Sequence, residues 1–185
     1  MMRFMDAYLL SATVGCGFAR TTAFFKLMAA LPHKKKMKIL TVCTGNICRS
    51  PMAEGILHAI FQADQFMTVS SAGTHAVAGN PATEFAVLAS QEKGIDITGH
   101  SARLLDSLLI SSSDVILCME PSHAEWVLSI DSSIYEKVYN LADFSGSDKR
   151  LKSIFDPYGC SLREYRECFD EINTCIHNFL LPGKK

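Results

Sequence analysis

The sequence feature that most constrains the fold is an eight-residue stretch, residues 43–50, which reads C-T-G-N-I-C-R-S. The apolar residues 39–42 come directly before it, and Pro51 comes directly after it. Proline is favoured at the first position of a helix, because the N–H that it lacks would have no helical partner there. A serine before that proline is a good helix cap. The stretch therefore predicts a strand, a tight loop and a helix in direct succession.

A loop of this kind is suited to hold an anion. Backbone N–H groups at the start of a helix have no helical partner, and together with the helix dipole they favour negative charge at that end. Gly45 and Asn46 tolerate backbone conformations that most residues avoid. We expect the loop to be a preformed nest for a tetrahedral phosphate group. The candidate phosphate-binding residues are Thr44, Gly45, Asn46, Ile47, Cys48 and Ser50.

Three side chains of the loop have the chemistry that cleavage of a phosphate ester needs. A free thiol is mostly protonated at neutral pH, but the N–H groups that bind phosphate also favour a thiolate, which would make Cys43 a nucleophile. The planar fork of Arg49 can pair with two phosphate oxygens at once. The hydroxyl of Ser50 can donate a hydrogen bond to the sulfur and ease its departure.

The cysteines allow two other interpretations. A lone cysteine after a strand is most often a small buried residue, and Cys43 with Cys48 has the spacing of half a zinc site. A structural zinc site needs a second close pair of ligands, which the other cysteines do not form. These are Cys16, Cys118, Cys160, Cys168 and Cys175. The complete octet, with its strand before and its helix after, favours catalytic phosphate chemistry without a metal or another cofactor.

Residues 42–54 read V-C-T-G-N-I-C-R-S-P-M-A-E and resemble the signature of the low-molecular-weight protein tyrosine phosphatases. The resemblance implies that Cys43 attacks phosphorus, that Arg49 holds the phosphate and that the product forms by way of a cysteinyl phosphate. A second feature, G-H-x-A-R at residues 99–103, resembles the bacterial members of the family. It implies that His100 braces the anion loop.

The segment D-P-Y-G, which begins at Asp156, is the candidate source of a general acid. Cleavage of phosphotyrosine expels a phenolate whose conjugate acid has a pKa of about 10, so a proton donor helps strongly. An aspartate before a proline is most often only a turn former, but this one is similar in placement to the acid of the family. The resemblance also implies that Tyr158 lines the pocket mouth. Animal members tend to carry two aromatic residues here, whereas this chain has Gly159 second.

The rest of the chain alternates between strand and helix patterns. Apolar, β-branched runs predict strands at residues 39–42, 66–71, 114–119 and 137–141. Helical spacing predicts helices at residues 51–61, 81–93, 121–128 and 161–180. In the second helix we expect Phe85, Leu88 and Ala89 to face inward. This order predicts an α/β fold of three layers, with a central four-stranded parallel sheet between helices and the anion loop between the first strand and first helix.

Composition separates the first 36 residues from the rest. Residues 1–36 carry six basic residues against Asp6 alone, whereas the remainder has 12 basic and 18 acidic residues. An acidic domain of this kind is not expected to bind nucleic acid. We expect residues 1–36 to be a disordered extension or the product of an upstream start codon, with a membrane-surface segment as the weaker alternative, and residues 37–185 to form the phosphatase domain. Seven cysteines without a staple-like pattern favour a reducing cytoplasm.

Two other functions would use the same loop. An arsenate reductase of this fold relays oxidation through two further cysteines on a mobile segment, and no close pair occupies the region around residues 115–130. A phosphate-binding module without catalysis would not need both Cys43 and Asp156, so their joint presence speaks against it. Cys48 is also a candidate for a reversible disulfide with oxidised Cys43, with a buried spacer as the alternative. The bacterial likeness implies a phosphotyrosine protein as substrate, with a tyrosine kinase that governs polysaccharide export as a candidate partner.

Overall fold

The computed structural model describes residues 36–146 and 152–180. The expected extension, residues 1–36, lies outside this part of the chain except for its last residue, so the boundary at residue 37 stays a prediction. Four strands form one sheet: β1 (Met37–Cys43), β2 (Met67–Gly73), β3 (Val115–Cys118) and β4 (Val138–Asn140). Their order is β2-β1-β3-β4, and every pair is parallel. The predicted α/β fold with a four-stranded parallel sheet is confirmed.

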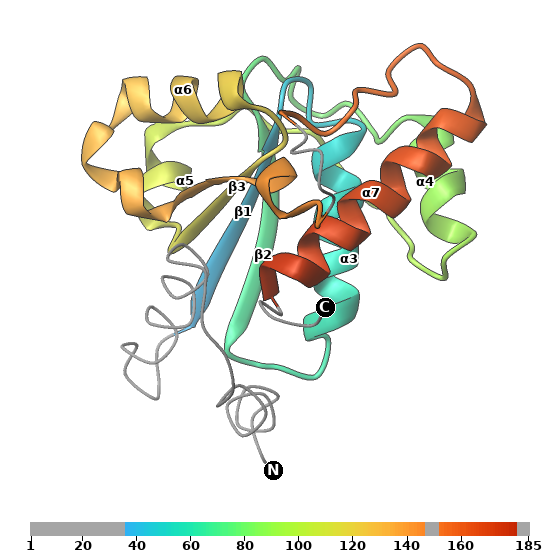
Figure 1. The fold of residues 1–185 in the computed structure, drawn as a ribbon, viewed down its shortest axis with the longest axis horizontal. Coiled ribbons are helices and arrows are strands. Elements are labelled where there is room, and N and C mark those ends of the chain that lie inside the picture. Colours follow the sequence, from blue (N-terminus) through green and yellow to red (C-terminus); the bar gives the residue numbers. More distant parts are fainter. Residues whose placement is uncertain (1–35, 147–151, 181–185) are drawn as a thin grey trace.

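Helices cover both faces of the sheet (Figure 1). On one face lie α3 (Arg49–Phe61), α4 (Glu84–Gln91) and α7 (Leu162–Leu180), and on the other lie α5 (Ser107–Ser112) and α6 (Pro121–Ile130). Two short 3₁₀ helices, η1 (Ser132–Lys137) and η2 (Leu141–Phe144), flank β4. The hydrophobic core is accordingly divided in two, with one cluster of buried side chains on each face. In the described part of the chain, no helix has the length and apolar character that crossing a membrane requires.

The central strand β1 contributes to both halves of the core. Ile39 and Cys43 belong to the cluster on the α3 face, whereas Leu40 and Val42 belong to the cluster on the α6 face. A parallel strand buried on both faces reads as a continuous apolar run, which is why residues 39–42 identified it from sequence. The last residue of β1 therefore directs its side chain toward the start of α3.

The long helix α7 packs along the α3 face by one apolar stripe. Its buried side chains recur every three or four residues, as an amphipathic helix requires. They are Tyr165, Cys168, Phe169, Ile172, Cys175, Ile176 and Phe179. Near its C-terminal end, the ring of Phe179 makes edge contacts with Phe144 at 5.0 Å and Tyr139 at 5.3 Å between centroids. These contacts fix α7 against the β4 edge of the sheet.

Two sequence expectations for the helices need correction. Ala89 is buried as expected, but Phe85 and Leu88, which were also expected to face inward, are 37% and 36% exposed, and Ala86 and Ser90 fill the other buried positions of α4. The short helix α5 was not predicted. Its sequence, S-L-L-I-S-S, has no long apolar stripe, and its one local signal is the Asp106 side chain, which accepts a hydrogen bond from the Leu109 N–H at 2.7 Å.

A close approach of backbones at the end of β2 positions the anion loop. A Cβ atom on Gly73 would lie 2.5 Å from the carbonyl oxygen of Thr44 and 2.9 Å from the backbone nitrogen of Asn46. Real Cβ atoms do not come so close to backbone atoms, so a glycine is required here. The His75 N–H donates to the same Thr44 carbonyl at 2.9 Å. The residues after β2 therefore support the loop from one side.

Candidate active site

The octet forms the predicted loop between β1 and α3, and Cys43 lies at its base. The Cys43 side chain is buried, with 3% of the residue exposed. Its Sγ atom lies 3.2 Å from the backbone nitrogen of Asn46 and 3.0 Å from the hydroxyl oxygen of Ser50. Hydrogen bonds to a sulfur atom favour its anionic form. The loop thus surrounds the thiol with donors at the N-terminal end of a helix.

Asn46 holds the loop in shape. It is the one residue other than glycine in the described part of the chain with a positive φ, at 54°. Its buried side-chain amide donates to the Ser50 hydroxyl at 2.9 Å and to the Ser71 hydroxyl at 2.8 Å, and its side-chain oxygen accepts from the Arg103 N–H at 2.9 Å. A buried polar group is stable only when it is hydrogen-bonded. Asn46 meets that condition with three different segments of the chain.

The structure brings His100 to the same residue. His100 Nε2 lies 2.7 Å from the backbone oxygen of Asn46, which is the contact that the resemblance implied. The other ring nitrogen lies 3.9 Å from a carboxylate oxygen of Glu54. His100 therefore connects the anion loop to α3.

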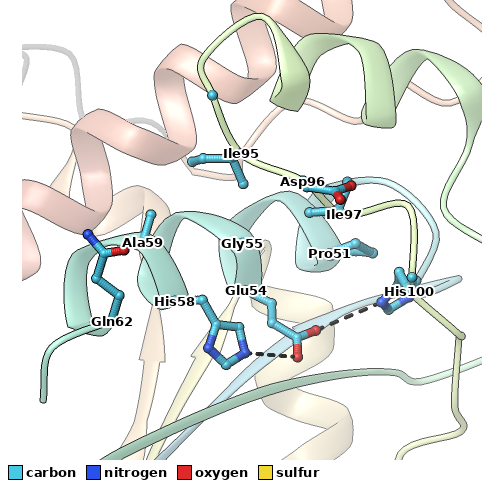
Figure 2. A pocket seen from close by; sticks show the side chains of 12 residues that line it. Pro51, Glu54, Gly55, His58, Ala59, Gln62, Ile95, Asp96, Ile97 and His100 are labelled. Atoms are coloured by element: carbon cyan, nitrogen blue, oxygen red, sulfur yellow. Dashed lines mark ion pairs between the residues drawn. The ribbon is translucent and has the colours of Figure 1, made fainter.

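Glu54 is a residue of this network that sequence reasoning missed. Its Oε2 atom accepts a hydrogen bond from the Ser71 hydroxyl at 2.5 Å, and its Oε1 atom lies 3.6 Å from His58 Nε2. Figure 2 shows the carboxylate between the two imidazoles of His58 and His100. Burial of Glu54 opposes its ionisation, but hydrogen bonds from His58 and Ser71 and the nearby His100 outweigh it and lower the pKa. The one sequence signal for Glu54 is its position as the last residue of the signature at residues 42–54.

The Glu54 carboxylate also borders a pocket of about 470 Å³ beside α3 (Figure 2). The pocket lies between α3 and residues 94–100. A Cβ on Gly55 would lie 2.7 Å from Ile97 and 2.8 Å from Ile95, so a glycine lets this segment approach the helix. The segment carries His100, and its close packing on α3 keeps that side chain against the anion loop.

Arg49 is buried at the start of α3 and contacts two carboxylates. Its Nη1 atom lies 3.1 Å from Glu120 Oε2 and 3.3 Å from the carbonyl oxygen of Ile154. Its Nη2 atom lies 2.7 Å from Asp156 Oδ2. Arg49 is 2% exposed, whereas the Asp156 side chain is 46% exposed. The structure thus brings together the two predicted residues, Arg49 and Asp156, and adds Glu120, which sequence reasoning missed.

A third residue that sequence reasoning missed is His123, in the first turn of α6. It is 2% exposed, and its Nε2 atom lies 2.9 Å from the Thr44 hydroxyl oxygen and 3.4 Å from Glu120 Oε1. Burial lowers the pKa of His123 to about 4. The imidazole is therefore neutral at ordinary pH. Neither Glu120 nor His123 belongs to a local sequence motif. The one sequence signal for both is that they come soon after a buried strand.

Cys48 is held away from solvent by two hydroxyl groups. Its sulfur lies 3.3 Å from the Tyr165 hydroxyl and 3.4 Å from the Thr83 hydroxyl, and the residue is 4% exposed. Burial raises the pKa of Cys48. Cys48 is therefore a protonated thiol at neutral pH. Cys118, Cys168 and Cys175 are buried as well.

The rim residues offer apolar surface beside the loop. Ile47 is half-buried and packs against the core, while Tyr158 is 66% exposed and Phe155 is 52% exposed. The Tyr158 N–H donates to Asp156 Oδ1 at 3.2 Å, so the aromatic residue and the acid share one turn.

Within residues 36–146 and 152–180, no group of three or more His, Cys, Asp or Glu side chains is arranged to hold a metal ion.

The Glu54 network gives a pH-dependent prediction. A carboxylate with a lowered pKa stabilises the fold above its unfolded value of 4.5, and that contribution is lost as the pH falls through the folded value. Glu54→Gln should therefore lower the free energy of unfolding at about pH 7, and the difference from wild type should shrink below about pH 4.5. Urea denaturation at both pH values measures this. The exposed Glu125→Gln is the control, and an equal loss at both pH values would contradict the prediction.

Comparison with known proteins agrees with this geometry. Residues 38–185 match the family described as low molecular weight phosphotyrosine protein phosphatase. The chain is 34% identical over 151 residues to a protein-arginine-phosphatase of Bacillus subtilis (strain 168), covering 80% of this chain and 98% of that protein. It is 37% identical over 138 residues to the probable low molecular weight protein-tyrosine-phosphatase EpsP of Ralstonia nicotianae, covering 75% of this chain and 90% of that protein.

A solved structure gives the same result for the fold. The low molecular weight protein tyrosine phosphatase from T. tengcongensis superposes with a TM-score of 0.71 at 35% identity, covering 78% of this chain and 98% of that one. The matched family spans the strand, loop and helix around Cys43 as well as the segment that carries Asp156. The chain therefore belongs to the low molecular weight phosphotyrosine protein phosphatase family.

Proposed function

We propose that this protein hydrolyses phosphotyrosine in proteins by way of a cysteinyl phosphate on Cys43. The observation that carries the proposal is the position of the Cys43 sulfur. It is buried at the base of the anion loop, within hydrogen-bond distance of the Asn46 N–H and of the hydroxyl of Ser50, which lies in the first turn of the helix that begins at Arg49. A phosphate group that entered the loop would meet the sulfur, the loop amides and the guanidinium together.

In the first step, the Cys43 thiolate attacks phosphorus and the phenolate leaves. Arg49 and the loop amides hold the equatorial oxygens, where their charge stabilises the transition state. Arg49 Nη1 stays bound to Glu120 and the Ile154 carbonyl, while Nη2 exchanges Asp156 for a phosphate oxygen. The exchange frees Asp156, whose half-exposed carboxylate takes up a proton from solvent and then donates that proton to the leaving phenolate.

In the second step, water cleaves the cysteinyl phosphate. Asp156, now ionised, takes a proton from the water, and the water oxygen bonds to phosphorus as the sulfur leaves. The Ser50 hydroxyl, 3.0 Å from the sulfur, donates to the departing thiolate. Inorganic phosphate and the free thiolate are the products. Arg49 and the N–H groups supply the positive charge in both steps.

The substrate class needs its own argument, because the relatives include both tyrosine and arginine phosphatases by name. Phosphotyrosine presents an apolar ring next to the phosphate, whereas phosphoarginine presents a cationic guanidinium that needs polar partners. Half-buried Ile47 and exposed Tyr158 offer apolar and aromatic surface, which suits a ring. We propose phosphotyrosine proteins as substrates, including a bacterial tyrosine kinase, and the cytoplasm as the location.

We also propose a domain boundary at residue 37. The match to residues 38–185 supports residues 37–185 as the phosphatase domain and residues 1–36 as an extension.

Hydrolysis of p-nitrophenyl phosphate at mildly acidic pH, without added metal and with EDTA present, tests the catalytic roles. Wild type should be active, Cys43→Ser should be inactive, and Asp156→Ala should lose about 10²–10⁴-fold in kcat, as expected for loss of a general acid. Asp170→Ala, which removes an exposed carboxylate on α7, is the control. An Asp156→Ala enzyme with wild-type kcat would refute the assignment, and an inactive but folded wild type would favour arsenate reduction or simple phosphate binding.

Two peptides that differ only in the phosphorylated residue test the substrate class. The kcat/KM for the phosphotyrosine peptide should exceed that for the phosphoarginine peptide by at least about tenfold, the effect of one favourable apolar contact. Ile47→Thr replaces the apolar side chain by a polar one that is also β-branched. This variant should reduce the ratio of the kcat/KM for the phosphotyrosine peptide to that for the phosphoarginine peptide. A preference of wild type for phosphoarginine would overturn the proposed substrate and leave the mechanism at Cys43 untouched.

We also propose that Cys48 protects Cys43 from over-oxidation. Peroxide would convert the Cys43 thiolate to a sulfenic acid with loss of hydroxide, and the Cys48 thiol would then attack that sulfur and release water as the disulfide forms. After mild peroxide treatment, peptide mass spectrometry should find Cys43 linked to Cys48 and activity should return with a thiol reductant. After the same peroxide treatment, the activity of Cys48→Ser should not return with the reductant. Peroxide treatment that yields no such link would leave Cys48 as a buried spacer.

A further inference from the structure

His123 is a buried histidine that the mechanism described above does not use. It lies in the first turn of α6, which begins with Pro121 directly after the extended residue Glu120. Because β3 pairs with β1, with Cys118 opposite Val42, the turn from β3 into α6 lies beside the anion loop. From that turn the imidazole reaches the first residue of the loop after the nucleophile, Thr44, at 2.9 Å.

The surroundings of the ring determine where its hydrogen lies. His123 Nδ1 is buried and makes no hydrogen bond with any described residue. A buried N–H without a partner is rarer than a buried acceptor without one, so a hydrogen on Nδ1 is disfavoured. A hydrogen on Nε2 instead points at the Thr44 hydroxyl oxygen and lies near Glu120 Oε1, at 3.4 Å. This tautomer leaves the hydrogen of the Thr44 hydroxyl free to donate elsewhere.

We propose that His123 is a positioning residue of the active site. The neutral imidazole donates from Nε2 to the Thr44 hydroxyl, so that Thr44, an exposed residue of the loop, presents its own hydrogen to an oxygen of the bound phosphate. The same ring borders Glu120, whose other carboxylate oxygen binds Arg49 Nη1 at 3.1 Å. One buried side chain thus orders both ends of the anion loop. The inference rests on the proposed phosphatase function.

The ring must remain neutral for this role. The charged and titratable groups around it are Glu120 on its own turn, Arg49 on α3, Asp156 in the last loop and His75 after β2. Burial is the largest influence, and Arg49 and His75 also oppose a positive charge, whereas Glu120 and Asp156 favour one. The pKa of His123 is lowered to about 4. Its contribution is therefore constant over the pH range in which the enzyme would be assayed.

Two substitutions of equal polarity separate positioning from simple packing. The side chain of glutamine reaches the place of Nε2, whereas that of asparagine is shorter and ends near the place of Nδ1. His123→Asn should lower kcat/KM for p-nitrophenyl phosphate about tenfold, the loss of one buried hydrogen bond, and should raise the Ki of inorganic phosphate. His123→Gln should stay within about threefold of wild type. The exposed His177→Gln on α7 is the control.

The pH profile and a double-mutant cycle supply readouts that a structural defect would not give. The loss in His123→Asn should be the same at every pH above about 5, because the ring is neutral throughout. Thr44→Val, which removes the hydroxyl, should lower kcat/KM by a similar factor, whereas Thr44→Ser, which keeps the hydroxyl, should lower it less. The Thr44→Val, His123→Asn double variant should be no worse than the poorer single variant. Multiplicative losses in the double variant would overturn the proposal.

Other results would contradict the proposal as clearly. Wild-type kcat/KM in a folded His123→Asn, equal losses in His123→Asn and His123→Gln, or a shifted pH profile would each refute it. Should neither His123 variant fold, the comparison of Thr44→Val with Thr44→Ser takes their place, and an active Thr44→Val refutes it. Should wild type hydrolyse no phosphate ester, the proposed function fails, but calorimetric binding of inorganic phosphate to wild type and His123→Asn still decides the role of His123.

Discussion

The conformation of Asn46 is the constraint on which the rest of the site depends. With φ at 54°, its backbone turns the loop so that its own N–H faces the Cys43 sulfur. A residue with a side chain adopts this conformation at a cost, which the surroundings must offset. Here the buried carboxamide binds Ser50, Ser71 and the backbone of Arg103. The segments that carry these partners are therefore required for a loop that is only eight residues long in the sequence.

The second constraint is electrostatic. Arg49 is almost completely buried, and an unpaired buried charge is strongly destabilising. Glu120 and the Ile154 carbonyl satisfy one side of the guanidinium from within the protein, while the more exposed Asp156 satisfies the other. The two sides thus differ in how easily they can be exchanged. A phosphate dianion can replace the exposed carboxylate without leaving Arg49 uncompensated, and the replaced carboxylate becomes available for proton transfer.

Local patterns predicted the parts of this site that lie close together in sequence. The strand and the loop follow from residues 39–51 alone, and the stripe of α7 follows from its spacing. The predicted helix start was wrong by two residues: α3 begins at Arg49, so Ser50 lies inside its first turn, where its hydroxyl contacts the Cys43 sulfur and does not cap the helix. The supporting residues could not be found in this way, because their contacts are distant in sequence: 25 positions separate Asn46 from Ser71, and 79 separate Thr44 from His123. Phe85 and Leu88 failed for another reason. Ala86 and the expected Ala89 take the buried positions of α4, whereas Phe85 lies at the edge of the packing, where its ring makes an edge contact with Tyr165 of α7 at 5.7 Å between centroids.

The central claim is that Cys43 carries the phosphoryl group during turnover. The most direct measurement is rapid-quench labelling with a radioactive phosphate monoester, followed by peptide mapping of the trapped protein. The account predicts a transient label of at most one phosphoryl group per molecule on the peptide that contains Cys43, absent from Cys43→Ser and formed before free phosphate appears. Turnover without any labelled peptide, or a label on another residue, would contradict it.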